Sequence, residues 1–188
     1  MRTAVNNLIK LICVAELELE ENYILQYFDI LMDNLKHPNL DIQKDACVGI
    51  DCLMNQIEES KKNGKFSSEG KKEIENKVKD LLKNSISEES IYINRGYTMC
   101  LSYLSEDFIR ENFEEIFKNL LFNCKVKMQK NPSKEKSDLE MRSNYNDYET
   151  RRISIESLCD ITIKLSKNKN NLENLRIYFD KIFEYIFD

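Results

Sequence analysis

Residues 42–50 are Ile42-Gln43-Lys44-Asp45-Ala46-Cys47-Val48-Gly49-Ile50. Apolar and small residues recur here every three or four positions, and the pattern continues through Leu53, Met54 and Ile57. That spacing is typical of a helix with one buried face. The stretch therefore predicts a helix that begins near Asp41, a residue type that caps helix amino termini well.

The same periodicity extends over nearly the whole chain. It predicts further helices at about 2–17, 20–36, 71–84, 90–104, 106–123, 148–166 and 171–187. Two polar stretches, about 59–70 and 125–146, are predicted to be loops. The 188 residues include 4 Gly and 2 Pro, which is too few for the frequent turns of a β-sandwich or barrel. The sequence thus predicts an all-α protein of about eight helices.

Four of the predicted helices share one register. The second helix of a HEAT unit has an apolar residue, then Arg, then small or apolar residues four and seven positions after the first. The four helices fit this order to varying degrees. The four frames start at Met1, Ile42, Ile93 and Thr150, so they lie 41, 51 and 57 residues apart. HEAT and armadillo units repeat every ~40–47 residues, and the excess falls in the two predicted loops.

This register favours an α-solenoid of HEAT/armadillo-like repeats, with roughly four partial or complete units. An up-and-down helix bundle is the alternative, but it predicts no common register. The first frame corresponds to the second helix of a unit, and the last helix to a first helix. Because neither end carries a polar capping repeat, residues 1–188 are expected to form a single segment of a longer array.

Charge and cysteine usage restrict the partners and the compartment. The chain has 28 Lys+Arg, 33 Asp+Glu and a net charge of −5, which argues against binding to nucleic acid or to an anionic membrane surface. It has no 18-residue apolar run and no recognisable signal peptide, so we expect no membrane span and a cytoplasmic location. Six cysteines lie in helical patterns and are expected to be buried thiols: Cys13, Cys47, Cys52, Cys100, Cys124 and Cys159.

Motifs of catalysis are missing from the sequence. It contains no Gly-x-Gly-x-x-Gly, no Gly-x4-Gly-Lys-Ser/Thr and no Gly-x-Ser-x-Gly pattern. His37 is the single histidine, and one histidine cannot complete the usual zinc sets. The chain is therefore expected to be neither an enzyme nor a holder of a cofactor.

Three stretches together resemble one known family. They are Arg2-Thr3-Ala4-Val5-Asn6-Asn7-Leu8-Ile9-Lys10-Leu11, Arg95-Gly96-Tyr97-Thr98-Met99-Cys100-Leu101-Ser102-Tyr103-Leu104 and Tyr148-Glu149-Thr150-Arg151-Arg152-Ile153-Ser154. In order and spacing they resemble the later part of the helical array of the tubulin-folding cofactor D family, over roughly residues 1–188. The Lys- and Asn-rich loops, and Ser105 in place of a proline, depart from that family's pattern.

The resemblance implies a chaperone role. Proteins of that family bind β-tubulin and assist assembly of the α/β-tubulin heterodimer with cofactors C and E and an ADP-ribosylation-factor-like small GTPase. It implies a cytoplasmic protein, with microtubule association as an option. Two alternatives stay open: a general HEAT adaptor, importin- or adaptin-like, that recognises a peptide or a GTPase, and a GTPase-activating component that acts through Arg152.

Four residues are candidates for partner contacts: Arg152, Arg95, Arg151 and Tyr97. Arginine forks pair well with the carboxylates of an acidic partner, and Arg152 is equally open to this role and to pairing within its own helix. Arg151 is favoured as a structural residue of the repeat, paired with Asp147 or Glu149. Tyr97 stands where the family has Phe, and Arg95 lies one position from the place of the family's Arg. Arg95 is also open to pairing with Glu88 and Glu89.

Overall fold

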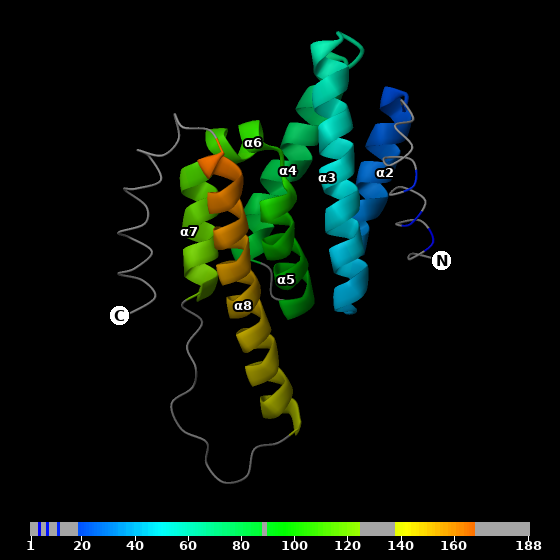
Figure 1. Ribbon diagram of the computed structural model, residues 1–188. Helices are drawn as coiled ribbons and strands as arrows, with labels where there is room; N and C mark the ends of the chain where they lie inside the picture. The colour runs from blue at the N-terminus through cyan, green and yellow to red at the C-terminus, as the bar shows by residue number, and fades with distance from the viewer. Residues whose placement is uncertain are drawn as a thin grey trace.

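Figure 1 shows the computed structural model of the chain, which describes residues 4, 7, 11, 19–87, 90–124 and 138–167. These residues form helices and connecting turns, with no strand among them. The helices are α2 (Glu21–Asn34), α3 (Leu40–Lys62), α4 (Ser68–Ser87), α5 (Ile91–Cys100), α6 (Glu106–Glu111), α7 (Phe113–Cys124) and α8 (Asp138–Ser166), with a 3₁₀ turn η1 at Leu101–Tyr103. The all-α prediction is confirmed.

The helices pack as consecutive pairs. α2 packs on α3, α4 on α5, and α7 on α8. Between pairs, α4 contacts both α2 and α7, while α5 contacts both α3 and α8. The pairs therefore follow one another across the molecule in chain order, with the short α6 placed against α7 and α8 (Figure 1). We call α2, α4 and α7 the first row, and α3, α5 and α8 the second row.

One hydrophobic core runs through these pairs. On α3, the predicted face is buried, with Ile50, Leu53 and Ile57 at most 1% exposed. Phe28 and Leu31 of α2 pack into the same core and are fully buried. Burial of each such side chain contributes about 1.5–3 kcal/mol. The helices thus form because their apolar stripes are shared between neighbours.

The start of α3 differs from the prediction. Asn39, not Asp41, caps the helix, since the Asn39 Oδ1 accepts hydrogen bonds from the main-chain N–H of Asp41 at 2.8 Å and of Ile42 at 3.4 Å. His37 Nδ1 in turn accepts a hydrogen bond from the Asn39 N–H at 3.0 Å. The turn at Pro38 therefore sets the cap two residues earlier than the apolar pattern suggests.

The loop predicted at 59–70 is shorter in the structure. α3 extends to Lys62 and α4 begins at Ser68, so only residues 63–67 connect them. Lys61 and Lys62 in the last turn favour the helix terminus electrostatically, and Gly64 leaves the helix with φ of 66°. The polarity of residues 59–62 and 68–70 therefore marks exposed helix ends rather than a loop.

Two further boundaries differ. The helix predicted at 106–123 breaks at Asn112, whose side-chain amide donates to the Phe108 carbonyl at 2.9 Å and ends α6. α8 begins at Asp138, so part of the loop predicted at 125–146 is helical. Residues 125–137 and the predicted helix 171–187 lie outside the described residues, as does most of the predicted helix 2–17.

Candidate functional site

Arg95 lies in a buried polar network rather than on an open surface. Its side chain is only 6% exposed. Its Nε donates to Gln43 Oε1 at 2.7 Å and its Nη2 to the Pro38 carbonyl at 2.8 Å, while its guanidinium lies 5.6 Å from the centre of the Tyr92 ring. The carboxylates predicted as alternative partners, Glu88 and Glu89, lie outside the described residues. Arg95 therefore joins α5 to the turn before α3.

Gln43 is the centre of this network. Its Nε2 donates to the Leu35 carbonyl at 2.7 Å and to the Tyr92 carbonyl at 2.6 Å. Its Oε1 accepts from Arg95. One fully buried amide thus links the end of α2, the start of α5 and a buried guanidinium. Tyr97, two residues after Arg95 on α5, is 5% exposed and belongs to the core.

Arg152 lies on the surface of α8 and pairs with carboxylates of its own helix. Its Nη2 donates to Glu149 Oε2 at 2.8 Å, and its Nη1 donates to Glu156 Oε1. The hydrogen bond with Glu149, supported by Glu156, raises the pKa of Arg152 above its ordinary value against the opposing effect of burial. About a third of the side chain, 34%, remains exposed. Arg152 is thus both held in place and accessible.

Arg151 is the residue before Arg152 on α8, and its side chain is half-buried. Its charge lowers the pKa of the Cys124 thiol at the end of α7, although burial dominates and raises that pKa to about 11. The side chain of Asp147, one of its predicted partners, lies outside the described residues. Arg151 therefore acts electrostatically on the end of α7, the helix that α8 packs on.

A second buried polar network was missed by sequence reasoning. Asn119 of α7 donates to the Leu82 carbonyl at 2.9 Å and to Ser85 Oγ at 3.2 Å. Asn123 donates to the Ser85 carbonyl at 3.2 Å and to Thr98 Oγ1 at 2.9 Å. The available signal was the spacing of the two asparagines, four residues apart on the apolar face of α7. They tie α7 to α4 and α5.

The cysteines are mostly core residues. Cys47 of α3 and Cys100 of α5 are fully buried, and burial together with a hydrogen bond to Cys100 raises the pKa of Cys47. Cys124 is also buried, whereas Cys52 on α3 is only partly buried and Cys159 on α8 is exposed. The prediction of a buried thiol is therefore wrong for Cys159 and only partly met for Cys52. The buried face of α8 includes Leu158, Ile161 and Leu165, and Cys159 lies outside that face. Cys13 lies outside the described residues.

These positions predict the order of thiol alkylation. At pH 8, iodoacetamide is expected to modify Cys159 before Cys47, Cys100 and Cys124, because Cys159 is exposed whereas the other three thiols are buried out of reach of the reagent. For Cys124, a pKa of about 11 additionally lowers the fraction of reactive thiolate. Peptide mapping by mass spectrometry over time measures this order. In guanidinium chloride the differences should disappear; equal rates in the folded protein would contradict the buried positions.

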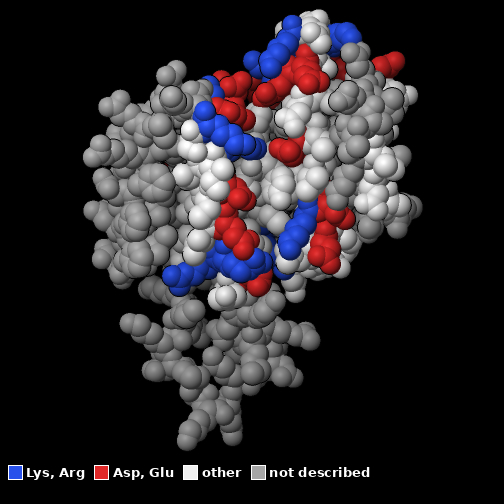
Figure 2. Space-filling view, viewed as in Figure 1, with Lys and Arg blue, Asp and Glu red and all other residues white. Residues whose placement is uncertain are grey.

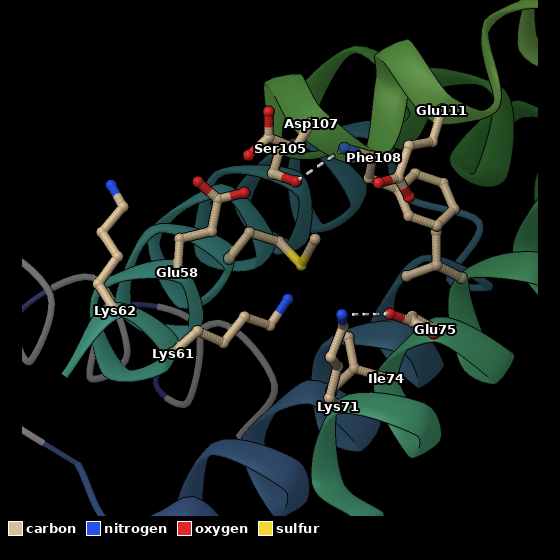
Figure 3. A pocket seen from close by; sticks show the side chains of 12 residues that line it. Glu58, Lys61, Lys62, Lys71, Ile74, Glu75, Ser105, Asp107, Phe108 and Glu111 are labelled. Atoms are coloured by element: carbon tan, nitrogen blue, oxygen red, sulfur yellow. Dashed lines mark hydrogen bonds and ion pairs between the residues drawn. The ribbon is translucent and has the colours of Figure 1, made fainter. Parts of the chain in front are cut away.

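A pocket opens where α3, α4 and α6 meet (Figure 3). It has a volume of about 230 Å³. The floor consists of the buried side chains Met54, Ile74, Val78 and Phe108. The rim carries Ser105 and seven charged side chains: Glu58, Lys61, Lys62, Lys71, Glu75, Asp107 and Glu111. The pocket is thus apolar below and charged with both signs above.

The charges of the visible face are mixed as well. Figure 2 shows Lys and Arg interspersed with Asp and Glu over the face that carries α3 and α8. A nucleic-acid surface requires a stripe or patch of positive charge, and this face has none among its described residues. A protein partner with both charge signs suits such a surface better.

Within the described ranges, no three His, Cys, Asp or Glu side chains gather where they could hold a metal ion. None of the described helices combines the length and apolar character that crossing a bilayer requires. Comparison of the chain with family models, with curated proteins and with solved structures gave no match.

Proposed function

We propose that this chain is a segment of a HEAT-like α-solenoid that binds another protein on its helical surfaces. The observation that carries the proposal is a repeated contact at equivalent positions. Gln43 of α3 and Asn94 of α5 occupy the same place in the repeat register, and their side-chain amides donate to main-chain carbonyls at the end of the preceding helix, Leu35 and Ser85 respectively.

The third equivalent position supports the same repeat. Arg151 of α8 acts on the thiol of Cys124, the last residue of α7. In two pairs, then, the second helix uses this position to hydrogen-bond the end of the first helix, and in the third its charge acts electrostatically on the end of the first helix. The two rows of helices agree with such a repeat, whereas an up-and-down bundle gives no reason for interactions that recur at equivalent positions. Stacked helical pairs form extended surfaces suited to protein partners.

For the partner, we propose β-tubulin, in a complex with tubulin-folding cofactors C and E and a small GTPase of the ADP-ribosylation-factor-like kind. This choice rests on the resemblance of three sequence stretches to the cofactor D family. Arg152 is the best placed of the four candidate residues to contact it, because Arg95 and Tyr97 are buried. An arginine that exchanges a carboxylate of its own helix for one of an acidic partner loses little in doing so.

Binding of purified tubulin tests this function. The full chain is expected to retain tubulin in a pull-down and in a titration by biolayer interferometry. Arg152→Ala should weaken binding by about tenfold, the usual effect of an arginine at the centre of an interface.

Lys36→Ala is the matched control, because Lys36 is also an exposed cation that pairs with a carboxylate of its own helix region, Asp33 at 3.9 Å, and it does not line the pocket between α3, α4 and α6. Its affinity for tubulin should equal that of the unchanged chain. If tubulin is absent from the bound fraction, β-tubulin is not the partner. Equal losses for both variants would remove Arg152 from the interface.

A further inference from the structure

We propose that the pocket between α3, α4 and α6 binds an extended segment of a partner protein that carries one large apolar side chain between an acidic and a basic residue. The apolar side chain would occupy the floor and the two charges would meet opposite sides of the rim. This inference deepens the proposed function, since it assumes a protein-binding array, but it does not depend on the partner being tubulin.

The size and floor of the pocket suit a side chain. Its volume of about 230 Å³ lies below the roughly 300–1,000 Å³ of pockets that enclose cofactors and drug-sized ligands. Met54 and Phe108, which are 4% and 8% exposed, form part of the floor. The flexible thioether of methionine adapts to side chains of different shape. A leucine-, methionine- or phenylalanine-sized group would therefore find apolar contacts on three helices.

The charges on the rim select against a simple anion. Three of the charged groups on the rim are already compensated: Lys71 and Glu75 pair with each other at 3.6 Å, and Asp107 pairs with Arg110 at 3.2 Å. Four carboxylates line the pocket against three ammonium groups. With those pairs set aside, Glu58 and Glu111 remain against Lys61 and Lys62. A phosphate or a nucleotide would leave the two carboxylates without a cation, whereas a segment with both signs would meet both kinds of charge.

The remaining charges lie on different sides of the pocket. In the described part of the chain, no ion-pair partner lies beside Lys61, Glu58 or Glu111. Figure 3 shows the Lys61 side chain extended toward the middle of the pocket beside α4, while Glu58 extends toward Ser105 and α6, the side that also carries Glu111. A bound acidic residue would face Lys61 and a basic residue would face Glu58 and Glu111. Opposite charges in this order fix the direction of the segment.

A set of short acetylated and amidated peptides tests the proposal on the full chain. The reference peptide has glutamates, a central leucine and lysines, and a second peptide has the reverse order. Control peptides replace the leucine by glycine or carry only lysines or only glutamates on both sides. Methyl NMR of the methionines gives a local readout, because Met54 lines the pocket whereas Met99 belongs to α5 and does not.

One of the two mixed-charge leucine peptides is expected to shift the Met54 methyl signal and leave the Met99 signal in place. The glycine and single-sign peptides should bind at least several-fold more weakly. Lys61→Glu should reduce the affinity of the preferred peptide about fivefold, as expected when an exposed attraction becomes a repulsion. Lys72→Glu, an equal charge change at an exposed position of α4 outside the pocket, should leave it unchanged.

The proposal is overturned if neither mixed peptide shifts Met54, if the glycine peptide binds as well as the leucine peptides, or if Lys61→Glu and Lys72→Glu have the same effect. Tubulin binding is measured separately on the same variants. A chain that binds the mixed peptide but not tubulin supports the pocket and refutes only the choice of tubulin. A chain that binds tubulin but none of the peptides refutes the pocket alone.

Discussion

Replacement of Gly96 by alanine is expected to lower the free energy of unfolding by about 3 kcal/mol or more. A Cβ at this position would lie 2.0 Å from the Leu35 carbonyl oxygen and 2.8 Å from Gln43 Nε2. The first of these is a main-chain atom, so relief requires α5 to move away from α2 and α3. Alanine favours a helix over glycine by only about 1 kcal/mol, so the clash outweighs the gain in propensity.

The other glycines provide controls for this substitution. At Gly64 an added Cβ meets nothing within 4 Å, and the φ of 66° alone makes alanine unfavourable by about 1 kcal/mol. At Gly70 the nearest atoms belong to the end of the Glu21 side chain, which can rotate away. Thermal unfolding measures all three variants, and each kcal/mol corresponds to roughly 2–4 °C for a chain of this size. Equal melting temperatures for Gly96→Ala and Gly64→Ala would contradict the close contact of α5 with the end of α2.

Most of the helices could be predicted because their burial follows a simple period. Ile50, Leu53 and Ile57 lie on one face by spacing alone, and the structure buries that face. The ends of helices depend on single hydrogen bonds that spacing does not show. Asn39 caps α3 because the turn at Pro38 aims its side chain at two free N–H groups, and Asn112 ends α6 through one bond to Phe108.

The candidate residues were harder to place because their exposure depends on distant partners. Nothing near Arg95 in the chain indicates that it is buried, since its partners Gln43 and Pro38 lie 52 and 57 residues away. The pocket likewise combines residues of three helices that no local motif connects. The surroundings of Arg152 are easier to predict from the sequence, because its partners Glu149 and Glu156 belong to the same helix.

Gln43→Leu is expected to destabilise the protein by about 3–5 kcal/mol. The substitution replaces the amide by an apolar side chain of similar size and so removes three hydrogen bonds. The carbonyls of Leu35 and Tyr92 lose their donor, and Arg95 Nε loses its acceptor. Because Gln43 and Arg95 are 0% and 6% exposed, water cannot replace these partners without opening the contact between α3 and α5. Urea unfolding, followed by circular dichroism, measures the change.

A double-mutant cycle separates the network from ordinary packing. Arg95→Leu alone should also destabilise the chain, since the Pro38 carbonyl and Gln43 Oε1 then lose a donor. The double variant should be more stable than the sum of both losses predicts, by about 1–2 kcal/mol, because the guanidinium and its missing acceptor are removed together. Gln26→Leu, at an exposed position of α2, should change stability by no more than about 0.5 kcal/mol. Strict additivity of the two buried substitutions would mean that Gln43 and Arg95 act independently, each through its own hydrogen bonds to main-chain carbonyls.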